Sequence, residues 1–310
     1  MTPVKYSPNG RFNHKYFFTC LVDFVTKNVS WRKYKGTITH PVNGLYLNGI
    51  HNRYVDYKVY DELNRQILNI YLKKDKEKKL KIQMIDSSFI ANKNGSVKNN
   101  NHLLKDETKK KILKYGKKIK NYRLRINPQA RLSNLGLIYQ KIKEETYIDY
   151  NRYNGRKKYH KVSILTDSIG IPLSVAMISS KQSDALSIPE TINNLHINLN
   201  TLRNSKINRY KQNILGDSLY HSKKNIAYLK SLGYNPIIKY NKRNTKNKKL
   251  IKKNKFTIKE KEIYRKRIKI ETTFAWIKNF PVINQNYQKK IESYNGLFLL
   301  ATSILISKKI

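Results

Sequence analysis

Four polar residues near the C-terminal end of the chain have the types and the spacing to do chemistry on a phosphate. They are Tyr264, Arg267, Glu271 and Lys278, separated by three, four and seven residues. At about 100° per residue, all four fall within an arc of roughly 60° on one helix. A carboxylate flanked by cations along one rim suggests phosphate chemistry.

An apolar stripe adjoins this polar arc and predicts how the helix packs. Its members are Ile263, Ile270, Phe274 and Ile277. The helix would bury this stripe and present Glu271 at the edge of the core. Alternatively, Glu271 is an exposed partner of Arg267, a pair four residues apart that is worth only a few tenths of a kcal/mol.

Two further acids follow predicted strands. An alternating apolar pattern over 80–84 leads to Asp86, and the short apolar run 213–216 leads to Asp217. Because the carboxyl ends of strands border a crevice in an α/β sheet, both acids could meet Glu271 there. Asp86 could instead shape a turn, and Asp217 could cap the helix that follows it.

Three carboxylates in a basic protein are the oxygen ligands that two Mg²⁺ or Mn²⁺ ions need. Two such ions about 4 Å apart activate an attacking hydroxyl and stabilise the leaving oxygen when a phosphodiester is displaced. The metals would also relieve the repulsion among the acids.

The remaining patterns predict a mixed α/β sheet flanked by helices. A hairpin over 159–177 turns at Asp167 and Gly170, which we interpret as turn residues. Asp184 is interpreted as the N-cap of a helix. The other predicted elements are a helix over 185–199, a helix over 222–232 closed by Gly233, a strand over 236–238 and a buried C-terminal helix over 297–306.

The N-terminal part predicts helices, including one over 57–72, broken into pieces by Gly36, Pro41 and Gly49. We divide the chain into an N-terminal helical region, 1–75, possibly DNA-binding, and a catalytic domain, 76–310. The first region is either a small helical domain or a helical cap on the main core. A Lys- and Asn-rich stretch, about 92–147, is interpreted as a basic, partly ordered insertion.

Composition points to a polyanionic partner. The chain has 64 Lys and Arg against 20 Asp and Glu, a formal charge of +44. An AT-rich genome, whose codons favour Lys, Asn, Ile and Tyr, is a second explanation of that surplus. Hydrophobic residues make up 39% of the chain, enough for a sizeable core, and the single Cys20 fits a reducing compartment. We expect neither a secretory signal nor a membrane span.

These residues together resemble a DDE transposase of bacterial insertion-sequence type, in the group with the signature Y-(2)-R-(3)-E-(6)-K. Tyr264, Arg267, Glu271 and Lys278 match the signature position for position. Three further segments resemble the first-acid strand, the hairpin and the second-acid strand: 85–88, 158–173 and 215–220. The stretch 29–34 resembles the leading helical region. The resemblance implies an RNase H-like core.

The resemblance also implies roles for single residues. Asp86, Asp217 and Glu271 would be the catalytic, metal-binding triad, holding two Mg²⁺ or Mn²⁺ ions. Tyr264, Arg267 and Lys278 would hold the DNA of the transposon end. Lys158 and His160 are further candidates for DNA contact, although His160 fits a structural strand histidine better. Ser218 and Leu219 depart from the basic residue and glycine that usually follow the second acid.

The implied activity is cut-and-paste transposition, in which the element's ends are cleaved and joined to target DNA. A homodimer is expected to pair two ends. The expected location is the cytoplasm or nucleoid if the protein is bacterial, and wherever the DNA is if it is viral. A related metal-dependent nuclease and a catalytically inactive or domesticated DNA-binding protein are the alternatives. Strand joining separates a transposase from a nuclease.

Overall fold

The computed structural model describes residues 13–73, 75–91, 149–150, 158–178, 182–195, 212–242, 249, 254–288 and 290–310. The predicted insertion at 92–147 lies outside these ranges. So does most of the basic loop that precedes the signature helix.

Six strands of the described chain form one mixed sheet. They are β1 (Ile82–Ala91), β2 (Asp149–Tyr150), β3 (Lys158–Thr166), β4 (Pro172–Ile178), β5 (Asn213–Gly216) and β6 (Asn235–Ile238). The strand β1 lies in the middle, antiparallel to β3 on one side and parallel to β5 on the other. Beyond them, β4 and β2 pair antiparallel with β3, and β6 pairs parallel with β5. The predicted hairpin and strands are confirmed, and the arrangement is that of an RNase H-like sheet.

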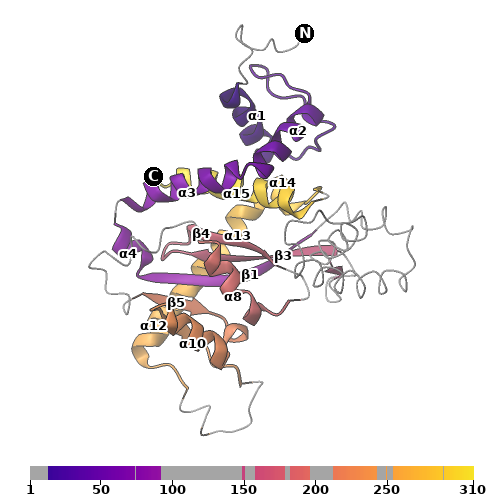
Figure 1. Ribbon diagram of the computed structural model, residues 1–310. Coiled ribbons are helices and arrows are strands. Elements are labelled where there is room, and N and C mark those ends of the chain that lie inside the picture. Colours follow the sequence, from indigo (N-terminus) through magenta and orange to yellow (C-terminus); the bar gives the residue numbers. More distant parts are fainter. Residues whose placement is uncertain are drawn as a thin grey trace, which may run out of the picture.

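Helices cover both faces of this sheet (Figure 1). Alternation along β1 sends Met84 to one face and Ile85 to the other, so each face carries its own apolar cluster. Met84 packs in a cluster with α13 (Lys269–Lys278) and α15 (Ile291–Ser307), and Ile85 packs in a cluster with α8 (Ile188–Asn193) and α10 (Lys223–Ser231). As predicted, α10 is followed by Gly233 with a positive φ of 82°, and α15 is largely buried. None of the described helices combines the length and the apolar character that a membrane crossing needs.

Two helix predictions were wrong in detail. Instead of one helix over 185–199, the chain forms a single 3₁₀ turn, η3 (Asp184–Leu186), and then α8, which starts at a proline-containing turn and is capped at Asn194. Gly49 was expected to break the N-terminal region but lies inside α2 (Gly44–Asp56). A single glycine costs only about 1 kcal/mol in a helix, which tertiary packing outweighs.

The N-terminal helices pack onto the C-terminal ones. They are α1 (His14–Thr26), α2, α3 (Val59–Lys73), which confirms the predicted helix over 57–72, and the short α4 (Lys76–Leu80). Phe24 of α1, Leu47 of α2 and Leu297 of α15 belong to the same continuous apolar cluster as Met84 of the sheet. The apolar contacts therefore run without a break from the N-terminal helices to the sheet, while the domain boundary at residue 75 stays a prediction.

Two histidines are buried in this core. The ring of His51 lies 2.8 Å from the Tyr60 hydroxyl through Nδ1 and 2.9 Å from the Ser293 hydroxyl through Nε2, which links α2, α3 and α15. His160 of β3 is 1% exposed and stacks on Tyr294 of α15, with the ring centroids 5.4 Å apart. Burial lowers the pKa of each histidine to about 4.

We therefore expect an acid-induced loss of stability. Between pH 6.5 and 4 the unfolded chain binds protons on these histidines that the folded protein does not, so the free energy of unfolding falls as pH falls through this window. From pH 6.5 to 5 the loss is about 2 kcal/mol per histidine. Asp86 and Asp167, whose pKa values burial raises, act in the opposite direction. The measurement is urea unfolding of the wild type and His160→Gln across this range, and an equal pH dependence of the two proteins would contradict the prediction.

The turn between β3 and β4 fixes the position of α13. The buried carboxylate of Asp167 accepts hydrogen bonds from the Ile169 and Ile171 amides at 3.0 and 2.9 Å and from the Tyr71 hydroxyl at 2.7 Å. This confirms Asp167 as a turn residue. The Thr273 hydroxyl of α13 donates to the carbonyl oxygen of Gly170 at 2.5 Å.

Gly170→Ala is expected to destabilise the protein by about 2 kcal/mol. Gly170 has a φ of +94°, and an added Cβ would lie 2.9 Å from Thr273 Oγ1 and 3.0 Å from the Lys269 carbonyl oxygen. Gly49→Ala is the matched control, because no atom lies within 4 Å of an added Cβ there, and alanine in the helix interior should stabilise by about 0.5–1 kcal/mol. Thermal and urea unfolding measure both. Equal effects of the two substitutions would refute the role of Gly170.

Candidate active site

Asp86 and Asp217 follow paired positions of neighbouring parallel strands. Ile85 of β1 pairs with Gly216 of β5, and each acid comes directly after its paired residue. Asp86 was predicted at the end of its strand but lies in the middle of β1, because β1 continues beside β3 after β5 has ended. It is therefore at the end of the parallel pairing rather than of the strand.

The signature segment is helical but is not one regular α-helix. It consists of α12 (Ile258–Arg265), a 3₁₀ turn η7 (Lys266–Ile268) and α13. Because a 3₁₀ turn winds three residues per turn, the predicted arc is only approximate at Arg267. The apolar stripe is confirmed: Ile270, Phe274 and Ile277 are buried and Ile263 is half-buried against the same cluster.

Arg267 connects the acids of β1 and α13. Its Nη1 lies 3.0 Å from Asp86 Oδ2 and its Nη2 lies 3.5 Å from Glu271 Oε1. The Arg267 and Asp86 side chains are 21% and 24% exposed, whereas Glu271 is 61% exposed. Glu271 is therefore an exposed partner of Arg267. The same guanidinium contacts both Glu271 and Asp86 and so links the two acids.

The other signature residues line the same region. Lys278 Nζ donates to Ser88 Oγ at 2.9 Å, and Ser88 shares a face of β1 with Asp86 because it is two residues further on. Tyr264 is half-buried with its ring 4.9 Å from that of Phe256. Burial raises the pKa of Tyr264, while the nearby Arg267 charge acts to lower it. Burial also lowers the pKa of Lys278.

The two remaining predicted contacts differ in outcome. Lys158 begins β3, but its side chain is outside the described part of the structure. The His160 ring is buried against Tyr294, so the structure gives it the structural role that the sequence left open and does not offer it to DNA.

Comparison with known families matches residues 140–306 to the transposase DDE domain, which is more than half of the 310 residues. The chain belongs to the transposase DDE domain family. No curated protein and no solved structure gives a match. The matched range of the transposase domain contains Asp217 and Glu271 but begins after Asp86. Membership implies an enzyme that acts on DNA, in a family that generally uses divalent metals.

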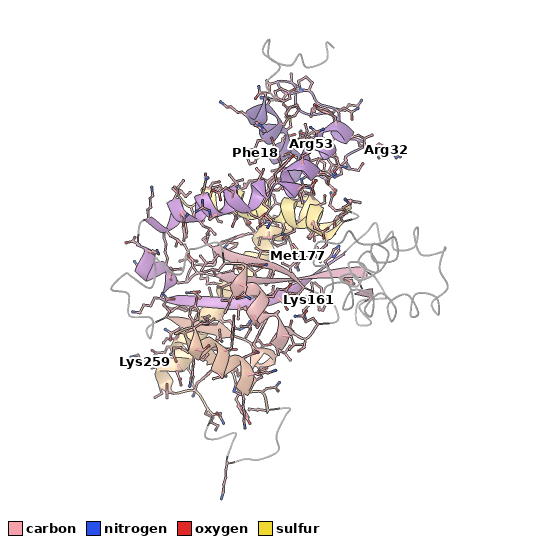
Figure 2. All side chains as sticks on the ribbon, in the orientation of Figure 1. Phe18, Arg32, Arg53, Lys161, Met177 and Lys259 are labelled. Atoms are coloured by element: carbon pink, nitrogen blue, oxygen red, sulfur yellow. The ribbon has the colours of Figure 1, made fainter. Side chains whose placement is uncertain are left out.

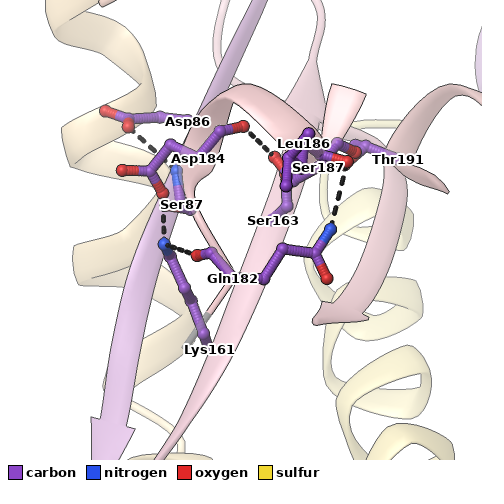
Figure 3. A network of polar contacts seen from close by, with 9 residues as sticks. All are labelled: Asp86, Ser87, Lys161, Ser163, Gln182, Asp184, Leu186, Ser187 and Thr191. Atoms are coloured by element: carbon purple, nitrogen blue, oxygen red, sulfur yellow. Dashed lines mark hydrogen bonds and ion pairs between the residues drawn. The ribbon is translucent and has the colours of Figure 1, made fainter. Parts of the chain in front are cut away.

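Sequence reasoning missed an ion pair beside the candidate site. Figure 3 shows Asp184 below Asp86, beside Ser87 and Lys161. Asp184 Oδ1 accepts a hydrogen bond from Ser87 Oγ and lies 2.6 Å from Lys161 Nζ, which also donates to the Gln182 carbonyl oxygen at 2.9 Å. Asp184 was predicted as an N-cap, but the N-cap is Ser183 and Asp184 is the first residue of η3.

Lys161 was the signal that could have revealed this pair. It directly precedes the mostly apolar stretch 162–165 of β3, and its side chain is only 5% exposed. A lysine is almost never fully buried without a partner. A carboxylate near β3 was therefore to be expected, although the sequence does not say which one.

Asp184→Asn is expected to lower the free energy of unfolding by about 3 kcal/mol, because it leaves the Lys161 ammonium buried without its counter-charge. Urea unfolding is the measurement. The double variant Asp184→Asn with Lys161→Met is the control and should recover most of the loss, because the buried charge is then gone. Two additive losses would show that the pair does not act as a unit.

The charges around Asp86 suit a site for cations. Burial raises the pKa of Asp86, and the negative charges of Asp184 and Asp217 raise it further. The Ser87 amide, which donates to Asp86 at 2.8 Å, and the Arg267 guanidinium act in the opposite direction. Among the described residues, no group of three or more Asp, Glu, His or Cys side chains is close enough together to hold a metal ion. The carboxylates nevertheless fit a divalent metal by donor chemistry and by their mutual repulsion.

Proposed function

We propose that the protein is a metal-dependent transposase that cuts DNA at the ends of its element and joins the freed 3′-hydroxyl to target DNA. The observation that carries this proposal is the meeting of Asp86 and Asp217 on neighbouring parallel strands, with Glu271 of α13 tied to Asp86 through Arg267. Family membership supports it, because the domain that contains Asp217 and Glu271 is a transposase domain.

In this proposal the three acids hold the metal ions. Asp86, Asp217 and Glu271 would bind two Mg²⁺ or Mn²⁺ ions, which supply an activated hydroxyl and stabilise the leaving oxygen of the phosphodiester. The structure supports a rigid setting for two of them. Asp86 pairs with Ile164 of β3 and accepts a hydrogen bond from the Ser87 amide, and Asp217 accepts the Ser218 amide at 2.5 Å.

The cations of the signature would hold the DNA end. Arg267 can make paired contacts to phosphate oxygens through its planar guanidinium, and Lys278 is a point charge on the same face of the sheet. Tyr264 packs beside Arg267 and would limit its orientation. With these roles, the chain would belong to the group with the Y-(2)-R-(3)-E-(6)-K signature. Because two ends must be joined, the active complex would be a homodimer on DNA.

The experiment is cleavage and joining of duplex DNA that carries the gene's own flanking sequences, with Mg²⁺ or Mn²⁺, by the wild type and Asp217→Ala. The wild type should cut and join, and the variant should bind the same DNA without doing either. Cutting without joining would favour a nuclease. A wild type that binds but neither cuts nor joins would favour an inactive, transposase-derived binding protein.

A further inference from the structure

A tight loop between α1 and α2 has a fixed shape. Gly36 and Pro41 pair across it as an isolated bridge. The Thr37 amide donates to the His40 carbonyl oxygen at 3.1 Å, and the His40 amide donates back to Thr37 Oγ1 at 3.0 Å. Gly36 has a φ of +82°, and an added Cβ would lie 2.1 Å from the His40 carbonyl oxygen. These contacts close the loop from both sides, so its tip is presented rigidly.

The residue at the tip of this loop is a fully exposed isoleucine, Ile38. Ile38 is 102% exposed, which means that none of its neighbours covers it. Single exposed apolar residues are common on protein surfaces. Ile38 differs from such residues because it is held at the apex of a rigid loop. Inserting its side chain into a binding partner would therefore cost little further conformational entropy.

The surroundings of Ile38 are cationic. No acidic residue occurs between Asp23 and Asp56. Asp23 itself accepts the Tyr34 hydroxyl at 2.7 Å and pairs with Lys27 at 2.8 Å. Besides Lys27, four exposed cations belong to this stretch: Arg32, Lys33, Lys35 and Arg53. Figure 2 shows Arg53 of α2 and Arg32 of the segment between α1 and α2 in the N-terminal part, away from the sheet.

Lys35 is tied directly to the loop. The Val42 amide donates to its carbonyl oxygen at 3.0 Å, so Lys35 stands at the base of the tip that carries Ile38. An apolar tip between cations has the chemistry of a DNA wedge: the cations bind phosphates, and the apolar side chain enters between two base pairs from the minor groove. A second copy of the chain is a poorer occupant, because two such cationic surfaces repel each other.

We propose that Ile38 is a wedge that inserts between base pairs of duplex DNA, with Lys35 contacting a phosphate beside it. That the duplex is the end of the protein's own element rests on the proposed function. The wedge lies on the loop between α1 and α2 rather than in the cluster of acids. Duplex binding and cleavage can therefore be lost separately.

The test compares Ile38→Ser with Ile70→Ser, an exposed isoleucine of α3 that serves as the matched control. The probe is a duplex with the gene's flanking sequence, and fluorescence anisotropy measures its affinity. Ile38→Ser should weaken binding by about tenfold or more, because a buried isoleucine is returned to water. Ile70→Ser should leave the affinity unchanged. Both variants should melt like the wild type, since neither side chain is in the core.

Two further measurements separate the wedge from its alternatives. A 2-aminopurine placed at successive base steps should brighten at one step with the wild type and not with Ile38→Ser, because the wedge unstacks that step. Lys35→Ala should lower the slope of log affinity against log salt by about one. Equal affinity of Ile38→Ser and the wild type would overturn the proposal. The proposal would also be overturned if Ile38→Ser lost a dimer, measured by light scattering, while its DNA affinity stayed unchanged. Ile38 would then be a contact between two copies of the chain.

Failure of the proposed function would look different. A wild type that neither cuts nor joins DNA, but binds the duplex in an Ile38-dependent way, would refute the catalytic proposal and keep the wedge. A wild type that cuts and joins, with Ile38→Ser binding equally well, would refute the wedge alone.

Discussion

Asp86→Asn is expected to lower DNA cleavage by at least about a thousandfold and to leave the affinity for duplex DNA unchanged. Asparagine has nearly the same shape, so its side-chain oxygen can still accept the Ser87 amide and the strand should stay in place. The lost negative charge is the one that the proposed metal ions require. The measurement is single-turnover cleavage of a duplex with the gene's flanking sequence at saturating Mn²⁺.

Asp86→Asn tests the site assignment from the structure more directly than a substitution within residues 140–306 would. Asp86 lies before residue 140, outside the matched range of the family. Its place beside Asp217 in the sheet and its ion pair with Arg267 assign it to the site. Asp56→Asn, at an exposed acid that ends α2, is the control and should cleave like the wild type. If Asp86→Asn retained full cleavage, the first member of the triad would have to be sought elsewhere.

Much of the sheet could be predicted from the sequence because strands carry a short-range signal. The alternating run before Asp86 and the apolar run before Asp217 each marked a strand, and the carboxyl ends of strands in such a sheet border one crevice. The convergence of these two acids was therefore predictable. The length of β1 was not, because β1 continues past Asp86 only through its pairing with β3.

The contacts that sequence reasoning missed are those between distant segments. Asp184 has the local pattern of a helix cap, and only the fold brings Lys161 of β3 and Ser87 of β1 to it. The role of His160 stayed open for the same reason, because Tyr294, on which it stacks, comes from the last helix. The 3₁₀ turn at 266–268 has no breaker in its sequence, so periodicity predicted one continuous helix.

Arg267→Gln is expected to change two properties in opposite directions. Cleavage should fall by roughly a hundredfold, because a charged contact to the scissile DNA is lost. Binding of Mn²⁺ in the absence of DNA should tighten by roughly tenfold, because the guanidinium that lies 3.0 Å from Asp86 and 3.5 Å from Glu271 no longer competes with the ion for the same carboxylates. Isothermal titration with Mn²⁺ and single-turnover cleavage measure the two effects.

Arg265→Gln is the matched control, because Arg265 is an exposed arginine on the last turn of α12, just before the 3₁₀ turn that carries Arg267. It removes the same charge from the same segment and should change neither Mn²⁺ affinity nor cleavage by more than about twofold. Weaker Mn²⁺ binding by Arg267→Gln would mean that the guanidinium helps to build the metal site. The expected opposite changes would instead mean that Arg267 neutralises the acids until DNA and metal arrive. On DNA binding, Arg267 would then exchange its contacts to Asp86 and Glu271 for contacts to a phosphate, and the two carboxylates would be left to hold the metal ions.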